Sequence, residues 1–170
     1  LWIGEPVVTV TEAGACRLGR VPRKRLRYGA ISYLDEVEQG PSPGDGRYLQ
    51  LPPIDPRIVE LARRASAVAT TDESRAFAVA QYLRRNYAYA VDLPAAESPD
   101  QVEEFLFERR RGHCEYFASS MAVMLRTLGI PSRLVTGFQG GPVNPLSGWR
   151  LIRASSAHTW VEAWIAGRGW

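Results

Sequence analysis

The sequence contains few of the residues that build metal centres or disulfide frameworks. Its 170 residues include only two cysteines and two histidines. These residues are too few and too scattered for a zinc site, and two cysteines do not make a disulfide scaffold. We therefore expect no metal and no cofactor.

Long apolar runs and one-sided charge are also missing. No run approaches the length of a membrane span, and the amino terminus lacks a signal-peptide pattern. A net charge of +3 gives no reason to expect a nucleic-acid partner. The composition is globular, with 45% hydrophobic residues, and the length suits one domain with a small appendage. Because the chain starts at Leu1 without a methionine and stops on a strand-like run at Trp170, we expect it to be a fragment.

Residues 1–50 differ from the rest and are predicted to be a β-rich segment. The runs Val7–Thr11 and Ile31–Leu34 are strand-like, and the Gly- and Pro-rich run 40–46 is typical of a loop. Residues 20–28 carry a basic run that is usually a solvated strand edge. A contact with the membrane or another cell-envelope component is the alternative for this run.

Residues 51–170 are predicted to form the main domain, which begins with helices. Asp55 is a good N-cap with Pro56 at the first helical position. Thr70 and Glu73 have the spacing of a capping box for a second helix, whose Phe77 is expected to face inward. The run 98–101 predicts the start of a third helix by the same capping logic.

The central stretch is a glycine-containing loop that leads into an apolar-periodic segment beginning at Cys114. The segment ends at Gly129-Ile130-Pro131, so the pattern predicts a helix whose first turn carries the cysteine. Unpaired N–H groups and the positive end of the helix dipole favour a negatively charged sulfur there. The backbone N–H of Cys114 is our candidate oxyanion donor. A buried cysteine in a core helix is the alternative.

Strands follow the cysteine helix. Segments 132–138, 149–154 and 157–165 are predicted strands, and the glycines at 167–169 predict a turn. The loop 139–148, which begins with Gln139, could shape a substrate cleft. Helices followed by an antiparallel sheet make the fold class α+β.

His158 is the candidate partner of Cys114. Alternation places His158, Trp160, Glu162 and Trp164 on one face of its strand. A cysteine at a helix start opposite a strand histidine suits nucleophilic catalysis, in which the histidine takes the thiol proton. A structural histidine under two tryptophans is the alternative. The other histidine, His113, ranks lower because a sequence neighbour on a helix turn points away from Cys114.

Three segments resemble the core of the bacterial transglutaminase-like superfamily. They are Gly112–Glu115, Arg126–Phe138 and Ala157–Glu162, and they occur in the family's order. The runs Phe105–Phe107 and Gln139–Gly141 further resemble its membrane-anchored branch. The resemblance covers residues 52–170. It implies a papain-like fold and a Cys-His-Asp triad with Cys114 as nucleophile and His158 as base. It also implies an extracytoplasmic, periplasmic domain of a membrane-anchored bacterial protein.

The third member of the family's triad is an aspartate just after a Gly-Trp pair, so we expect this acid to lie beyond Trp170. Glu162 does not easily replace it. Its α-carbon lies four strand residues from that of His158, or roughly 13 Å at about 3.3 Å per residue. We expect the core to be truncated before its last strand, and Gln139 and Trp160 to line the substrate cleft.

The leading functional prediction is thiol-dependent acyl transfer from protein glutamine side-chain amides to amines through a thioester. Hydrolysis by a cysteine peptidase or amidase shares the first half-reaction and differs only in using water as acceptor. A catalytically idle module that binds peptides or cell-wall polymer is the alternative from another class. The expected partners are a glutamine-containing protein or peptide and an amine or water.

Overall fold

The computed structural model describes residues 2–3, 8–10, 16–18, 28–29, 46–92 and 100–170. The chain divides into two compact units, Leu1–Val37 and Glu38–Trp170. Most of the basic run at residues 20–28 and the expected strand Ile31–Leu34 lie outside the described residues. The start of the main domain at residue 51 stays a prediction.

The described residues of the first unit form short antiparallel pairs. β1 (Trp2–Ile3) pairs with β4 (Tyr28–Gly29), and β2 (Val8–Val10) pairs with β3 (Cys16–Leu18). β2 lies within the strand predicted from Val7 to Thr11.

The second unit begins with helices, as predicted. They are η1 (Arg47–Leu49), α1 (Pro56–Ala65), α2 (Asp72–Asn86), α3 (Gln101–Glu103), the π-helix η2 (Glu104–Arg109) and α4 (Cys114–Thr127). Within the described ranges, none of these helices is long and apolar enough to cross a membrane.

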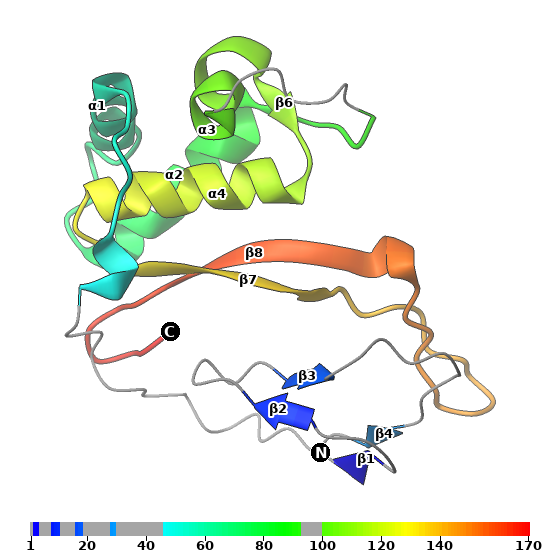
Figure 1. Ribbon diagram of the computed structural model, residues 1–170. Helices are drawn as coiled ribbons and strands as arrows, with labels where there is room; N and C mark the ends of the chain where they lie inside the picture. The colour runs from blue at the N-terminus through cyan, green and yellow to red at the C-terminus, as the bar shows by residue number, and fades with distance from the viewer. Residues whose placement is uncertain (1, 4–7, 11–15, 19–27, 30–45, 93–99) are drawn as a thin grey trace. The chain divides into compact units, whose positions relative to one another are not determined.

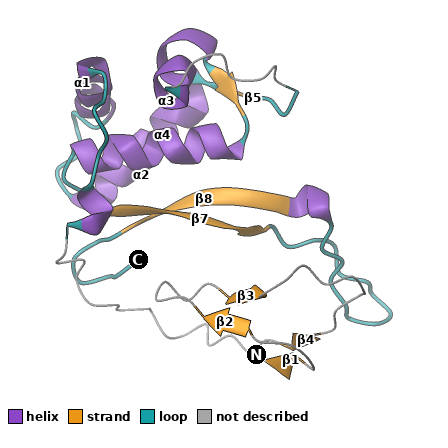
Figure 2. Ribbon diagram, in the orientation of Figure 1, coloured by secondary structure: helices purple, strands orange, loops and turns teal. Residues whose placement is uncertain are grey.

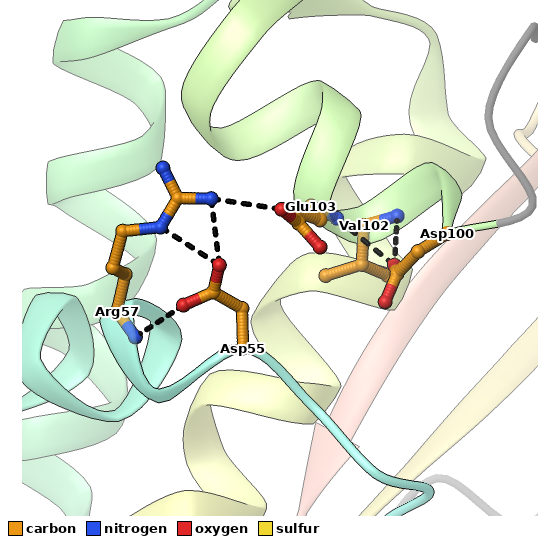
Figure 3. Close-up of polar contacts among 5 residues, drawn as sticks. All are labelled: Asp55, Arg57, Asp100, Val102 and Glu103. Carbon is orange, nitrogen blue, oxygen red and sulfur yellow. Dashed lines mark hydrogen bonds and ion pairs between the residues drawn. The ribbon is translucent and has the colours of Figure 1, made fainter.

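The predicted cap of α1, Asp55, is present, and an ion pair joins the start of α1 to the start of α3 (Figure 3). The cap of α3 is Asp100, which lies within the predicted run 98–101. Asp55 accepts a hydrogen bond from the Arg57 N–H at 2.7 Å, and the Arg57 side chain also lowers the pKa of the Asp55 carboxyl. The Arg57 guanidinium donates to Glu103 at 2.8 Å. Asp100 accepts from the N–H groups of Val102 and Glu103 at 3.1 and 3.0 Å. These contacts fix the start of α3 against the start of α1.

Two predictions for α2 are wrong. Its capping box joins Thr71 and Ser74 rather than Thr70 and Glu73, because a serine at the third helical position reaches back as well as a glutamate does. Phe77 is 66% exposed, and the buried stripe of α2 instead runs through Val79 and Leu83.

The core lies between the helices and one face of a hairpin. α4 lies between α1 and α2 on one side and the hairpin on the other (Figure 1; Figure 2 shows the two layers by element type). The largest fully buried side chains of the core are Phe105, Ile58, Leu83, Met124, Leu125, Ile130 and Val79. Several of them come from α4 and the turn after it, so the packing of this domain holds the cysteine helix in place.

The hairpin consists of β7 (Ser132–Phe138) and β8 (Ala157–Ala163), which pair antiparallel over their full length with Gly137 opposite His158. The helices and this hairpin confirm the α+β prediction. The strand predicted at 149–154 is wrong, because only Arg150 forms an isolated bridge, to Val143. Pro142 lacks an N–H, so the opposing segment does not continue a ladder.

Candidate active site

Cys114 is the first residue of α4, as the sequence predicts. The carbonyl of His113 accepts hydrogen bonds from the N–H groups of Tyr116 at 3.1 Å and Phe117 at 3.4 Å. The N–H groups of Cys114 and Glu115 precede these donors and have no acceptor within the helix. These two N–H groups and the positive end of the helix dipole therefore lie at the start of α4, where Cys114 is.

The chain reaches this helix through two short, unusual elements. The π-helix η2 ends at Arg109, and the next residue, Arg110, has a left-handed backbone with φ of 52°. β6 (Arg111–Gly112) then pairs parallel with β5 (Ala88–Tyr89). The N–H of Ala88 donates to Arg110 O at 3.0 Å, and that of Ala90 donates to Gly112 O at 2.9 Å. These bonds fix the direction from which the chain enters α4.

Gly112 is the last residue of β6 and packs against the first turn of α4. A Cβ atom at Gly112 would lie 2.7 Å from Tyr116 Cβ and 3.0 Å from Phe105 Cδ2. Real Cβ atoms essentially never lie closer than 3.0 Å to such neighbours. The sequence therefore needs glycine here for steric reasons, and not for an unusual φ.

Cys114 and His158 line one cavity of about 550 Å³ between the helices and β8. Gln139 and Trp160, the two residues expected in the substrate cleft, line the same cavity. Its other lining residues are Ala80, Leu83, Arg84, Tyr89, Phe117, Ala118, Met121, Thr159 and Val161. The structure therefore brings together all four described residues that the sequence analysis singled out for the site.

The cavity is lined by residues from both faces of β8. Alternation puts His158 and Trp160 on one face of the strand and Thr159 and Val161 on the other, yet all four line the cavity. The first turn of α4 and the start of β8 both reach this cavity.

Among the described residues, the lining contains no carboxylate and includes one arginine, Arg84. The arginines that precede Cys114 contact other groups instead. Arg109 pairs with Glu104 at 2.6 Å, and Arg110 and Arg111 donate to backbone carbonyls at 3.4 Å. Among the described lining residues, Arg84 is therefore placed to add positive potential at the cavity, and no local sequence pattern indicates this role.

The structure places Glu162 in a different role from a triad acid. Its carboxylate accepts from Arg133 Nε at 2.7 Å and from Trp160 Nε1 at 3.3 Å. Within the described ranges, no carboxylate is hydrogen-bonded to the imidazole of His158. In the same part of the chain, no group of three His, Cys, Asp or Glu side chains could hold a metal ion.

His113 faces a second cavity, of about 570 Å³, on another side of α4. Glu115, Tyr116 and Ser119 line it as well, whereas Cys114 does not. This separation agrees with the lower rank given to His113 as a base. Sequence reasoning did not anticipate the second cavity, which depends on how α4 packs against β7 and the segment before α1. It also missed Tyr89 in the lining of the first cavity, because that contact depends on how β5 packs.

Comparison with known proteins gives consistent matches. A family model described as the transglutaminase-like superfamily matches residues 59–170. The chain is 38% identical over 126 residues to a protein-glutamine gamma-glutamyltransferase of Pseudomonas aeruginosa, covering 73% of this chain and 19% of that protein. It is 35% identical over 136 residues to the protein YebA of Bacillus subtilis, covering 73% of this chain and 18% of YebA.

The periplasmic domain of TgpA from Pseudomonas aeruginosa is similar in structure, with a TM-score of 0.65 at 38% identity. The alignment covers 73% of this chain and 43% of that domain. The chain thus spans less than a fifth of the length of the two curated relatives, at 19% and 18%.

Proposed function

Because the chain belongs to the transglutaminase-like superfamily, we propose that it catalyses acyl transfer from protein glutamine side chains through a cysteine thioester. The observation that carries this proposal is the cavity shared by Cys114, at the first turn of α4, and His158, at the start of β8. The protein-glutamine gamma-glutamyltransferase among its relatives supports the choice of glutamine as acyl donor.

In the first half-reaction, His158 takes the thiol proton as the sulfur of Cys114 attacks the glutamine carboxamide carbon. The carbonyl oxygen becomes an oxyanion, which the backbone N–H of Cys114 stabilises at the start of α4. His158 then gives its proton to the leaving nitrogen, and the carbon–nitrogen bond breaks to release ammonia and leave a thioester.

In the second half-reaction, a primary amine attacks the thioester and His158 accepts one of its protons. The carbon–sulfur bond breaks, an isopeptide-type amide forms, and the sulfur of Cys114 recovers the proton from His158. Water in place of the amine would give glutamate, which is the hydrolytic alternative. Gln139 and Trp160 line the cavity at this point and would contact the substrate amide or its flanking residues.

The third member of the triad is proposed to come from sequence that follows Trp170. Two observations support this. Glu162 is engaged by Arg133, and an isolated antiparallel bridge joins Ile165 to Gly169. A strand continuing from that bridge would run beside β8 and reach the level of His158 within about ten residues. An acid there would orient the imidazole and stabilise its charged form.

An extracytoplasmic location, in a membrane-anchored bacterial protein, belongs to the same proposal. It is supported by the similarity to the periplasmic domain of TgpA. Residues 20–28, a further candidate contact with the cell envelope, lie mostly outside the described residues.

The test is transfer of a labelled primary amine onto a glutamine-containing protein, with residues 1–170 and with a version extended past Trp170. Cys114→Ala should abolish labelling, and Cys16→Ala, the matched cysteine control, should retain it. The extended version should react faster, and equal rates would overturn the proposed position of the third acid.

The other outcomes distinguish the alternatives. If amide or peptide hydrolysis is lost in Cys114→Ala and no amine is ever incorporated, the protein is a cysteine hydrolase. If neither reaction occurs and an alkylating agent modifies Cys114 no faster than Cys16, the domain is a catalytically idle binding module and not an enzyme.

A further inference from the structure

The connection between β7 and β8 is an exposed apolar hairpin. It leaves the sheet at the end formed by Phe138 and Ala157 and runs away from the helices (Figure 1). We define the apolar hairpin as residues 139–153. It lies next to the candidate active site, since its first residue, Gln139, lines the cavity of Cys114.

The base of this hairpin is tied by backbone contacts. The N–H of Leu151 donates to Pro142 O at 3.1 Å, and the guanidinium of Arg150 donates to Gly141 O at 2.9 Å. A Cβ atom on Gly141 would lie 1.6 Å from Leu151 O, so the two chain segments touch where only glycine fits. The hairpin therefore has a defined shape along its length.

The tip is also ordered by hydrogen bonds. The Asn144 side-chain oxygen accepts from the N–H groups of Leu146 at 2.9 Å and Ser147 at 3.2 Å. The Asn144 N–H donates to Trp149 O at 2.7 Å, and Gly148 closes the turn with φ of 70°. This local network orders the turn that carries Leu146, which is 97% exposed.

An unusually large number of the exposed side chains of the hairpin are apolar. Trp149 is 65% exposed, and Val143, Leu151 and Ile152 are between 43% and 53% exposed. Single exposed apolar residues are ordinary, but five within ten positions on one protruding loop mark a contact surface.

The charges of the hairpin have one sign. Its charged residues are Arg150 and Arg153, and the sequence has no aspartate or glutamate anywhere between Glu115 and Glu162. A partner for this surface must accept apolar side chains at the tip and supply negative charge at the base. An anionic lipid surface has this layering, with phosphates outside and acyl chains beneath.

We propose that the apolar hairpin docks on an anionic membrane surface. Leu146 and Trp149 enter the boundary between headgroups and acyl chains, where tryptophan is favoured, and Arg150 and Arg153 lie near lipid phosphates. A narrow convex tip suits insertion into lipid better than it suits a peptide, which binds in grooves. This docking would orient the Cys114 cavity toward substrates held close to a membrane.

The test is co-sedimentation of the chain with vesicles of phosphatidylcholine alone or with added phosphatidylglycerol, which needs no activity assay. We expect binding to the anionic vesicles, weakened by salt. Leu146→Ser should weaken vesicle binding about tenfold, because burying a leucine side chain contributes a free energy that corresponds to about that factor in affinity. Arg153→Gln should weaken it several-fold, since one basic residue near an anionic surface contributes about that much.

Two control variants keep the test specific. Val68→Ser removes an apolar side chain that is 94% exposed between α1 and α2, and it should leave vesicle binding unchanged. Replacing Arg23, Lys24 and Arg25 by glutamine tests whether the basic run near the N-terminus, rather than the hairpin, holds the vesicles.

The proposal is overturned if no vesicle binding occurs. It is also overturned if Val68→Ser weakens binding as much as Leu146→Ser does, or if only the variant lacking the basic run loses it. A raised KM for a protein substrate in Leu146→Ser, with unchanged vesicle binding and unchanged KM for a small glutamine amide, would assign the hairpin to substrate docking instead.

Discussion

Gly112 and Tyr116 approach so closely that no side chain larger than hydrogen fits between them. A Cβ atom built on Gly112 would lie 2.7 Å from Tyr116 Cβ and 2.9 Å from Tyr116 Cγ. Because the first contact is with a Cβ fixed to the helix backbone, rotation of the tyrosine side chain does not relieve it. The position of the β6 end is thus coupled to the turn that carries Cys114.

We predict that Gly112→Ala lowers the free energy of unfolding by about 1–3 kcal/mol, the usual cost of overpacking. It should also lower kcat, because relief of the contact moves the first turn of α4. Gly140→Ala is the control, since its nearest neighbour is the flexible end of Arg150 at 3.2 Å. Denaturant unfolding and the amine-transfer assay measure both effects. Equal stability of the two variants would contradict the steric argument.

The ion pair between Arg133 and Glu162 predicts a structural role for Glu162. The two residues lie opposite each other on β7 and β8, and both side chains are mostly buried. Glu162→Ala should lower the free energy of unfolding by about 1 kcal/mol, as expected for a cross-strand charged pair. It should retain most of the Cys114-dependent activity.

Glu162→Gln is the matched control, because it keeps an acceptor for the Arg133 hydrogen bond without the charge. A fall in kcat as large as that of His158→Ala, in either Glu162 variant, would instead make Glu162 a catalytic residue.

Ionisation of Tyr87 should lower the free energy of unfolding at alkaline pH. Burial, and to a lesser degree the nearby Tyr82, raise the pKa of Tyr87 to about 12, and its hydroxyl donates to Leu106 O at 2.9 Å. The folded state therefore holds this proton more tightly than the unfolded state does. The stabilisation is complete below pH 10 and is lost as the pH rises through 12.

Tyr87→Phe should accordingly cost about 1 kcal/mol at neutral pH through the lost hydrogen bond. Its free energy of unfolding should fall less steeply than that of the wild type between pH 10 and 12. Urea unfolding at a series of pH values measures the difference, and parallel curves would disprove the assignment to Tyr87.

A substitution at Gly137 should affect the cavity of Cys114 rather than the core. The ring of Trp160 lies over it, so that a Cβ at Gly137 would be 3.0 Å from Trp160 Cη2. Gly137→Ala should shift the ring by a few tenths of an ångström and raise KM several-fold. Adding Trp160→Phe should reduce this effect, because the smaller ring leaves room for the methyl group. Strictly additive effects in the double variant would show that the two residues are not coupled.

Local patterns predicted the elements that present Cys114 and His158. The apolar period and the Gly-Ile-Pro stop defined α4 to within one residue at each end. The β-branched run from Ser132 matches β7 in full, because buried alternation and two-strand pairing leave little freedom there.

Other features depend on tertiary context that local patterns do not carry. Thr70 and Thr71 are equally good caps in sequence, each with a polar residue three positions on, and the spacing alone does not decide between Glu73 and Ser74 as the partner. Residues 149–154 have strand propensity, but the segment opposite them contains Pro142 and Pro145 and gives them one bridge instead of a ladder. Arg84 reached the cavity of Cys114 through helix packing, which no spacing along the chain reveals.

The parallel strands β5 and β6 should separate from each other more readily than the helices unfold. Two backbone hydrogen bonds, from Ala88 and Ala90, hold the residues that precede Cys114, and both residues of β5 are exposed. Such a pair can separate while the buried helices stay folded. In hydrogen exchange, the amides of Ala88 and Ala90 should therefore exchange well before those of the inner turns of α4. The cysteine would then sit at the junction of a slow-exchanging helix and a fast-opening strand, which lets its surroundings adjust to a substrate without unfolding the domain.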